Sequence, residues 1–518
     1  MDRSSSYDEL PYGSNAVAEM HPNRMATVAR LFGLDPAPVR TCRLLEIGCA
    51  EGGNAIPLAL ALPEARVVGI DLSERQIAIG KECISELGLS NVELVRADLA
   101  ELGPDFGPFD YVCAHGVYSW VAPCLQEKLL AACHALLSPD GIAYVSYNTF
   151  PGWSVQLVLR EMGLYRARRE GDAVRKIGAA RRLLDGVAGS ATAGGDAYRA
   201  LLASHWKALE SYNDEYLFHD HFELDNNPCW FHELASKAEA AGLTYVADAL
   251  LGTTPVTTVD PGIVRALEGI AGDRFEREQY LDFLRFRSFR QSLFCRSGRT
   301  PLAEPDLSVL DRLHAVTLVC PRTTPVDLRA SVAVEFVSPR GAILETGDPV
   351  LKAALAHLWD RSPEAVSFAE LSRLPSFPRS GSAEEDLGRL RRSLLGAYAD
   401  RFVDLLEHVP AYVRRPGDRP AASPLARRQA GRRCSQVTSL LHRNLILEGI
   451  PLLVLSRLDG TRDAETLARE TTEVIVSEVL LRDPAGKGVT DPSIVRPLVD
   501  EAMGPILEGL AMGALLTA

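Results

Sequence analysis

The residues with the clearest chemical potential stand in LLEIGCAEGGN (Leu44–Asn54), where an apolar run breaks into a Gly-rich turn before a helical segment. Glycines at such a junction let the backbone approach a ligand closely, and the helix N-terminus presents free N–H groups. A second apolar run, VVGIDLS (Val67–Ser73), ends in Asp71, whose carboxylate can accept hydrogen bonds from ribose hydroxyls. Together the two stretches predict half of a nucleoside-binding fold.

The spacing of the glycines separates this turn from the one that binds dinucleotides. A dinucleotide site requires G-x-G-x-x-G, whereas here Gly48, Gly52 and Gly53 follow Glu46. A carboxylate beside the turn is unfavourable for a diphosphate but suits a zwitterion. The arrangement E-x-G-x-x-x-G resembles the first motif of S-adenosylmethionine-dependent methyltransferases with a Rossmann-like fold, whose cofactor carries a cationic sulfonium and a methionine tail. A βα turn that binds nothing is the alternative.

Further strand and helix patterns follow in the order of an α/β fold. NVELVRAD (Asn91–Asp98), FDYVC (Phe109–Cys113) and GIAYVSY (Gly141–Tyr147) have the pattern of a third, fourth and fifth strand. Apolar residues at helical spacing over Leu125–Leu137 predict a helix between the last two. This alternation predicts a doubly wound parallel sheet, with the ligand at the carboxyl ends of its strands. Asp98 is placed there to accept a hydrogen bond from an adenine amine.

Length and composition restrict the class of protein. With 518 residues, the chain exceeds what one hydrophobic core usually serves, so two or three domains are expected. The ten cysteines form no CxxC pair, which argues against a zinc site or a disulfide framework and predicts reduced thiols in the cytoplasm. No apolar run approaches the roughly 20 residues of a membrane span, and MDRSSSYDEL lacks the apolar core of a secretory signal. The net charge of −13 argues against nucleic-acid binding.

The chain changes character beyond the fifth strand. Residues from about 155 to 240 are helical in pattern, and we interpret them as an insertion over the ligand edge of the sheet. AGLTYVADA (Ala241–Ala249) predicts a late strand of the same sheet, and Phe275–Phe294 predicts a long amphipathic helix with solvated arginines. Leu374–Asp386 and Arg414–Arg427 are Pro-, Ser- and Arg-rich and predict loops or linkers.

Motifs along most of the chain point to one family. AHGVYSW and YNTFPGW, then YLFHDHFE and FLRFRSFRQSLFCR, and finally PLARRQAGRRCSQVTSLLH and LDGTRD resemble the bacterial protein lysine methyltransferases that carry a methyltransferase regulatory domain. The resemblance is strongest in the first two motifs and loose after about residue 300. NAVAEM, before His21, lacks the Pro and Thr of the family, and SLLH departs from the usual Asn after Thr438.

The resemblance implies a domain order and a cofactor. Residues 1–160 would form a Rossmann-like methyltransferase core with an N-terminal flap, and residues 161–335 a helical regulatory or substrate region that includes a late core strand near 243–249. Residues 336–518 would form a C-terminal α+β winged-helix-like substrate platform. The cofactor would be S-adenosylmethionine, with no metal. Its expected contacts are Glu46, Gly48, Cys49, Gly52, Asn54, Asp71, Leu72, Asp98 and His115.

Methyl transfer is an in-line displacement, so it depends on placing a nucleophile about 3 Å from the sulfonium methyl. A lysine amine must be neutral to react, and desolvation or a nearby base must overcome its free pKa of ~10.4. A His or Tyr can accept the proton directly or through water, and aromatic faces attract an alkylammonium. The candidates lie at the ends of the fourth and fifth strands: His115, Tyr118, Trp120, Tyr147 and Trp153, with Asn148 beside them.

Other polar residues have weaker signals. His21 and Tyr12 fit either a flap over the cofactor or a helix-capping or packing role, and Glu51 fits a solvated charge. A group of histidines and acids near residue 220 matches no standard zinc spacing, so we expect hydrogen bonding between domains instead. The members of that group are His219, Asp220, His221, Glu223 and His232.

Three functions fit these observations. The leading one is an N-methyltransferase acting on lysine side chains of a protein or peptide, and the alternative is a methyltransferase of a small molecule or natural-product peptide. A non-catalytic scaffold is disfavoured by the intact turn with Asp71 and Asp98. Because every cofactor motif precedes residue 160, we expect residues after about 340 to be dispensable for cofactor binding. The acidic chain also argues against DNA binding by the helix-turn-helix pattern around LDGTRDAETL.

Overall fold

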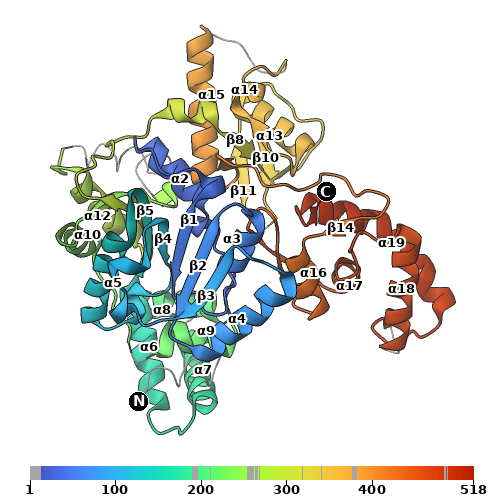
Figure 1. The fold of residues 1–518 in the computed structure, drawn as a ribbon, viewed down its shortest axis with the longest axis horizontal. Helices are drawn as coiled ribbons and strands as arrows, with labels where there is room; N and C mark the ends of the chain where they lie inside the picture. Colours follow the sequence, from blue (N-terminus) through green and yellow to red (C-terminus); the bar gives the residue numbers. More distant parts are fainter. Residues whose placement is uncertain are drawn as a thin grey trace.

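The computed structural model describes residues 13–189, 196–210, 212–223, 225–253, 262, 267, 269–317, 319–339, 341–375, 382–482, 486 and 488–517. Tyr12 and the motif around it lie outside the described residues, as does part of the loop predicted at Leu374–Asp386. A sheet flanked by helices forms the larger body, and a helical C-terminal part projects from one side of it (Figure 1). Among the helices of the described residues, none is long and apolar enough to cross a membrane.

The central sheet has seven strands in the order β3-β2-β1-β4-β5-β7-β6. Neighbouring strands are parallel from β3 to β5, whereas β7 is antiparallel to both β5 and β6. The predicted Rossmann-like α/β class is confirmed, although the sheet is mixed and not wholly parallel. The strands are β1 (Arg43–Ile47), β2 (Arg66–Asp71), β3 (Val92–Arg96), β4 (Phe109–Ala114), β5 (Leu137–Asn148), β6 (Leu243–Asp248) and β7 (Phe289–Arg296).

Two hydrophobic cores hold the sheet between its helices. Successive strand residues face opposite sides, so Leu44 and Val67 belong to one core and Leu45 and Val68 to the other. The predicted helix over Leu125–Leu137 is confirmed as α5. The helices around the sheet are α2 (Pro22–Leu31), α3 (Ala55–Ala61), α4 (Glu74–Leu87), α5 (Pro123–Leu136) and α10 (Phe231–Ala240).

The long amphipathic helix predicted over Phe275–Phe294 is wrong. Helix α12 spans Arg274–Arg285 and ends where Phe286 adopts a φ of +50°, and the following residues form β7. Strand β7 is covered on both faces, so its apolar residues need not alternate, and the pattern reads as a continuation of the helix. Arg290 is therefore fully buried, not solvated.

A helical cluster with its own small core follows β5. Leu159, Leu184, Trp206 and Phe222 pack together in it. The insertion leaves the sheet at the carboxyl end of β5 and returns there through a parallel bridge between Thr149 and Cys229, after which α10 leads to β6, the expected late strand. Its helices are α6 (Trp153–Ala167), α7 (Ala173–Gly189), α8 (Ala197–Leu209), α9 (Asp214–Leu217) and the π-helix η6 (Phe218–Phe222).

The part after β7 packs against α2. Arg24 of α2 forms an ion pair with Asp404 at 2.9 Å, and Asn23 of α2 exchanges hydrogen bonds with the backbone of His408. This part joins the larger hydrophobic core of the sheet. Its helices and strands are η8 (Leu307–Arg312), β8 (His314–Val316), β9 (Cys320–Pro321), β10 (Val334–Val337), β11 (Ile343–Thr346), α13 (Pro349–Arg361), β12 (Val366–Ser367), α14 (Phe368–Leu371), α15 (Ala383–Ala399) and β13 (Asp404–Leu406).

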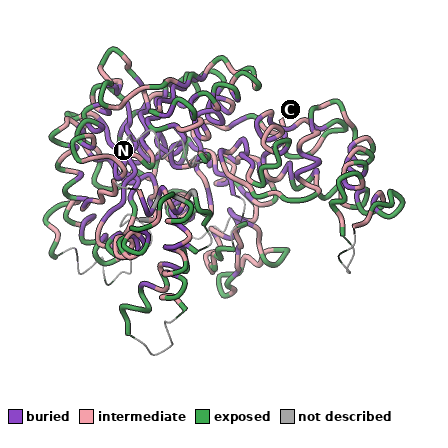
Figure 2. Tube along the Cα trace, turned by 90° about the horizontal axis from the view of Figure 1, so that it is seen from below, coloured by how far each residue is buried: buried purple, intermediate pink, exposed green. Residues whose placement is uncertain are grey.

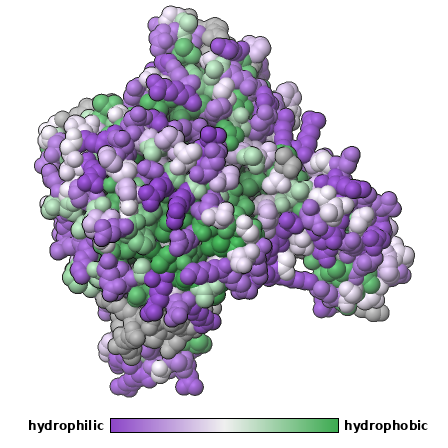
Figure 3. Space-filling view, viewed as in Figure 1, coloured by the Kyte–Doolittle hydropathy of each residue, from purple (hydrophilic) through white to green (hydrophobic). Residues whose placement is uncertain are grey.

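The C-terminal part is a small α/β unit with a separate core. Figure 2 shows its outer helices as largely exposed, in contrast to the buried centre of the main body. Hydrophobic side chains surface among hydrophilic ones on this projection (Figure 3). Its elements are β14 (Ala421–Ala422), α16 (Pro424–Gly431), β15 (Gln436–Thr438), β16 (Asn444–Ile446), α17 (Ile450–Leu455), α18 (Ala464–Ser477), α19 (Pro492–Met512) and β17 (Leu516–Thr517).

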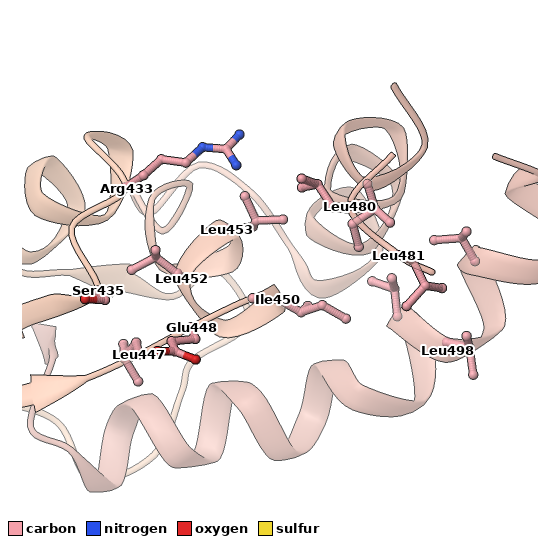
Figure 4. A pocket seen from close by; sticks show the side chains of 14 residues that line it. Arg433, Ser435, Leu447, Glu448, Ile450, Leu452, Leu453, Leu480, Leu481 and Leu498 are labelled. Carbon is pink, nitrogen blue, oxygen red and sulfur yellow. The ribbon is translucent and has the colours of Figure 1, made fainter. Parts of the chain in front are cut away.

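An apolar pocket of about 490 Å³ opens within this unit (Figure 4). Leu453 of α17, Ile475 of α18 and Val499 of α19 line it, and Arg433 stands at its rim. None of its lining residues is a predicted site residue, so the chemistry must be sought elsewhere.

Candidate functional site

The glycines of the turn between β1 and α3 occupy positions where a side chain would not fit. Gly48 has a φ of +76°, and a Cβ at this position would lie 2.6 Å from Cγ2 of Val117. At Gly53 a Cβ would lie 2.2 Å from the backbone oxygen of Ser14, whose hydroxyl accepts a hydrogen bond from the Gly53 N–H at 2.7 Å. The chain just before α2 therefore covers the turn directly.

Two buried polar side chains face each other across the start of this turn. Glu46 and Asn54 are 5% and 3% exposed, and Glu46 Oε2 and Asn54 Nδ2 have no hydrogen-bond partner among the described residues apart from each other. Burial raises the pKa of Glu46 to about 8, the charge of Asp71 adds to the shift, and the Asn54 amide opposes it. A buried acceptor and a buried donor with no described partner other than each other fit the ammonium and the carboxylate of an amino acid.

The Asp71 carboxylate, at the end of β2, faces the turn and accepts hydrogen bonds from backbone N–H groups. One carboxylate oxygen accepts a hydrogen bond from the Ala50 N–H at 2.8 Å and the other from the Ser73 N–H at 2.9 Å. Burial raises its pKa, and these N–H groups oppose the shift. The carboxylate thus fixes the turn while each oxygen keeps a lone pair for a further donor.

The remaining predicted cofactor contacts surround the same turn. Leu72 is exposed beside Asp71, whereas Cys49 is buried and burial raises the pKa of its thiol. Asp98 lies two residues beyond β3 and accepts a hydrogen bond from the Ala100 N–H at 2.8 Å. Gly52 has a φ of +81° within the turn. The structure brings these residues to the carboxyl ends of β1, β2 and β3, where the sequence places them.

His115 follows β4 directly. Its Nδ1 lies 2.8 Å from the hydroxyl of Tyr144, and its ring stacks on that tyrosine and meets the edge of Phe289. Burial lowers the pKa of His115 to about 4, so the ring is neutral at pH 7. A neutral ring already bonded to Tyr144 is suited to positioning more than to accepting a proton.

Four aromatic residues pair at the ends of β4 and β5. The rings of Tyr118 and Tyr147 meet edge to face at 6.1 Å, and those of Trp120 and Trp153 at 6.4 Å. The Tyr147 hydroxyl lies 3.0 Å from that of Ser292. Burial raises the pKa of both tyrosines, so both remain hydroxyl donors at neutral pH.

The helical insertion supplies two residues to this aromatic group that the sequence analysis did not assign to it. Trp153 Nε1 donates a hydrogen bond to Oδ1 of Asn226 at 2.9 Å, and the ring of His221 stacks on Trp153 at 6.0 Å with an interplanar angle of 12°. Burial lowers the pKa of His221 to about 4. The residues around Asn226 give no sign of this role, because its partner Trp153 lies 73 positions earlier in the sequence.

Unsatisfied polar atoms collect beside these rings. Within the described part of the chain, Tyr118 Oη, Asn148 Nδ2 and Asn226 Nδ2 are buried and have no hydrogen-bond partner. Buried polar groups are normally paired, so three such donors around an aromatic cluster indicate a candidate ligand-binding surface. We refer to Tyr118, Trp120, Asn148, Trp153 and Asn226 as the acceptor edge.

The histidines near residue 220 form hydrogen bonds. His219 Nδ1 lies 3.1 Å from a carboxylate oxygen of Glu223, and His232 Nδ1 lies 2.9 Å from Oε1 of Gln279. A search of the described residues finds no group of three or more His, Cys, Asp and Glu side chains that could hold a metal ion. Glu51 is half-buried, not a solvated charge, and burial raises its pKa.

The C-terminal unit contacts the turn, which the sequence analysis did not foresee. His442 Nε2 lies 2.7 Å from Oδ1 of Asn54, and its ring meets that of His21 at 5.3 Å. His21 itself accepts a hydrogen bond from the Asn23 N–H at the start of α2. Residues after 340 are therefore in contact with a predicted cofactor residue, although the sequence analysis expected them to be dispensable for binding.

Comparison with known proteins identifies the parts of the chain. Residues 44–141 match the family profile "Methyltransferase domain", residues 213–296 match "Predicted methyltransferase regulatory domain", and residues 418–515 match "PKMT, C-terminal winged helix domain". Uncharacterized protein RP789 of Rickettsia prowazekii is 28% identical over 98% of this chain and 93% of its own length. Uncharacterized protein RP028 of the same organism is 36% identical over 45% of this chain and 94% of its own length.

Two solved structures of one protein are similar over nearly the whole chain. PKMT2 from Rickettsia typhi in complex with AdoHcy is 27% identical, with a TM-score of 0.87, over 98% of this chain and 100% of that one. The similarity spans the sheet, the helical insertion and the C-terminal unit, and it confirms the predicted winged-helix fold of that unit together with the profile match.

Proposed function

The chain belongs to the S-adenosylmethionine-dependent protein lysine methyltransferases (PKMT), and we propose that the acceptor edge receives a lysine side chain of a protein or peptide substrate. The observation that carries this proposal is the group of buried, unpaired donors beside two pairs of aromatic rings at the ends of β4 and β5. Aromatic faces attract an alkylammonium, and unpaired donors fix a peptide carbonyl.

S-adenosylmethionine, when bound, supplies the electrophilic methyl group. Glu46 and Asn54 would hold its amino-acid end, and Asp71 and Asp98 would accept hydrogen bonds from its ribose and adenine. The residues present fit this cofactor because a buried acceptor and a buried donor lie together at the turn, with no described partner other than each other.

The chain's contribution to the transfer is positioning. His115 and His221, beside the acceptor edge, have a pKa of about 4, and Tyr118 and Tyr147 have a raised pKa, so none of these four described groups is a strong base at pH 7. The aromatic walls would desolvate the lysine ammonium, which lowers its pKa and yields the neutral amine. Solvent water would accept the proton that the ammonium loses.

Location and partners follow from the same features. The ten cysteines are all free thiols, which favours a reducing compartment, and we infer a cytoplasmic enzyme. The net charge of −13 favours a basic protein surface over nucleic acid as partner.

The substrate class is tested by incubating the enzyme with methyl-labelled cofactor and a host lysate. We expect label in protein, released as methyllysine after acid hydrolysis. Label confined to extractable metabolites would instead support the alternative, methylation of a small molecule.

We expect Tyr118→Phe to lower kcat about tenfold without changing stability, because the hydroxyl has no protein partner within the described residues. Affinity for S-adenosylhomocysteine should stay the same. Tyr111→Phe is the matched control, since it removes a hydrogen bond to the Ala37 oxygen at 2.7 Å on the other side of the sheet. That variant should lose about 1 kcal/mol of stability and keep its kcat. Unchanged turnover in Tyr118→Phe would remove Tyr118 from the acceptor edge.

We expect binding of S-adenosylhomocysteine to release a proton from Glu46 below pH 8. The pKa of Glu46 is about 8 in the free protein, and a ligand ammonium favours the carboxylate, so the pKa falls on binding. Affinity should therefore drop as the pH falls from 7 to 6, by up to about tenfold. In that range the ligand amine, with a pKa of about 8, stays protonated.

Calorimetry in two buffers of different ionisation enthalpy measures the proton release. Glu46→Gln should abolish the release, and 5′-methylthioadenosine, which has no amine, should show none with either protein. Equal proton release by wild type and Glu46→Gln would assign the proton to another group.

A further inference from the structure

We propose that His442 of the winged-helix unit is a positioning residue of the cofactor site, which orients the Asn54 amide toward the amino-acid end of the cofactor. The proposal rests on the placement of that end at Glu46 and Asn54 made above. It brings a residue 388 positions away in the sequence into the binding site.

The hydrogen bonds fix which atom of the Asn54 side chain is which. The Val17 backbone N–H can only donate, and it contacts Asn54 Oδ1 at 2.9 Å, so that atom is the amide oxygen. His442 Nε2 lies 2.7 Å from the same oxygen, so Nε2 must carry the hydrogen and donate it. The oxygen then accepts two hydrogen bonds, and the amide cannot rotate without losing both.

Fixing the oxygen also fixes the nitrogen. Asn54 Nδ2 is left as a buried donor whose only partner in the described part of the chain is the Glu46 carboxyl beside it. If the Asn54 amide turned over, its oxygen would face the Glu46 carboxylate. The Glu46–Asn54 pair would then have no N–H donor for the cofactor carboxylate. The winged-helix unit therefore keeps one donor and one acceptor side by side, as a zwitterionic ligand requires.

His442 is held in this role by its surroundings. It is 1% exposed, and its ring meets that of His21 edge to face at 5.3 Å. Burial and the neighbouring His21 keep its pKa well below the usual value, so the ring stays neutral with one hydrogen. That single hydrogen lies on Nε2, which leaves Nδ1 as a buried acceptor without a partner in the described residues.

A separate contact docks the same unit without touching Asn54. Arg428 and Arg432, on and just after α16, form ion pairs with Glu86 of α4. This contact supplies a matched control, because its loss weakens docking in general and leaves the donor to Asn54 in place.

The test compares two ligands that share adenosine and the thioether and differ in the amino-acid end. We expect His442→Leu to weaken S-adenosylhomocysteine binding about five- to tenfold, measured by calorimetry, and to leave 5′-methylthioadenosine binding unchanged. His442→Gln, which carries an N–H donor at a similar reach, should restore the affinity. Arg428→Gln should change neither ligand.

Each other outcome overturns the proposal. Equal weakening of both ligands by His442→Leu would mean loss of structure and not of orientation, and no weakening of either would mean that Asn54 needs no help. His442→Met asks the same question if the leucine variant does not fold. Glu46→Gln serves as the reference, because a selective loss in that variant alone would uphold the placement of the amino-acid end and reject only His442.

Discussion

Arg290→Met is expected to lower the free energy of unfolding by about 3–5 kcal/mol, the largest effect of any single change considered for this protein. Arg290 is fully buried in β7 and binds three carboxylates, with Nε 2.8 Å from Asp282, Nη1 3.1 Å from Asp248 and Nη2 3.0 Å from Glu278. Its guanidinium also lies 4.1 Å from the ring centre of Phe231. Removing it takes the main positive partner from Glu278 and Asp282 and one of the positive partners from Asp248.

The pKa values of two of these carboxylates are shifted in opposite directions. Although burial opposes it, the charges of Arg287 and Arg290 hold the pKa of Asp248 below its usual value, whereas burial raises the pKa of Glu278. Without Arg290, the cost of keeping these groups charged in the interior rises sharply.

Urea unfolding followed by fluorescence measures the change, and Arg391→Met is the control. Arg391 pairs with Asp311 and Glu384, which are both exposed, so its loss should cost less than about 1 kcal/mol. A loss below 1 kcal/mol in Arg290→Met as well would show that the buried network contributes little to the fold.

The second large effect concerns the cofactor. We expect Asp71→Ala to weaken S-adenosylmethionine binding by about 1–3 kcal/mol, because it removes a charged acceptor of the ribose hydroxyls. The substitution also frees the Ala50 and Ser73 N–H groups that the carboxylate holds, so the turn loses a fixed contact at the same time.

Ser73→Ala is the control for local damage beside Asp71. Ser73 Oγ accepts a hydrogen bond from the Gln76 N–H at the start of α4, so its loss weakens the helix start next to Asp71 and leaves the carboxylate intact. That variant should bind S-adenosylmethionine normally in calorimetry. A folded Asp71→Ala protein with unchanged affinity would exclude Asp71 as a cofactor contact.

The sequence predicted those features whose signals are local. The turn after β1, the acid at the end of β2 and the order of the first five strands all follow from short apolar runs and the residues that end them. The prediction failed at Phe275–Phe294, because a strand buried on both faces has the same continuous apolar character as a helix. The antiparallel β7 was missed for the same reason.

Contacts between distant residues left no local signal. His442 and Asn54 lie in different domains, and nothing in SLLH or in the Gly-rich turn indicates the other. Asn226 likewise joins Trp153 only because the insertion folds back onto the end of β5. The residues of the candidate site that come from a single turn were therefore predicted, and those that depend on how domains meet were not.

The chain around Ser14–Val17 has a consequence for how the enzyme is made. Ser14 contacts Gly53, Val17 contacts Asn54, and the oxygen of Ala16 accepts a hydrogen bond from Asn444 at 2.9 Å. The cover over the turn thus joins Ser14–Val17 to a residue that is synthesised more than 400 positions later. A ribosome synthesises all seven strands of the sheet before it synthesises Asn444, so a nascent chain can hold these strands while the cover over the turn is still incomplete. We expect activity to begin only after the C-terminal unit has emerged, so the sheet can fold before the enzyme becomes active.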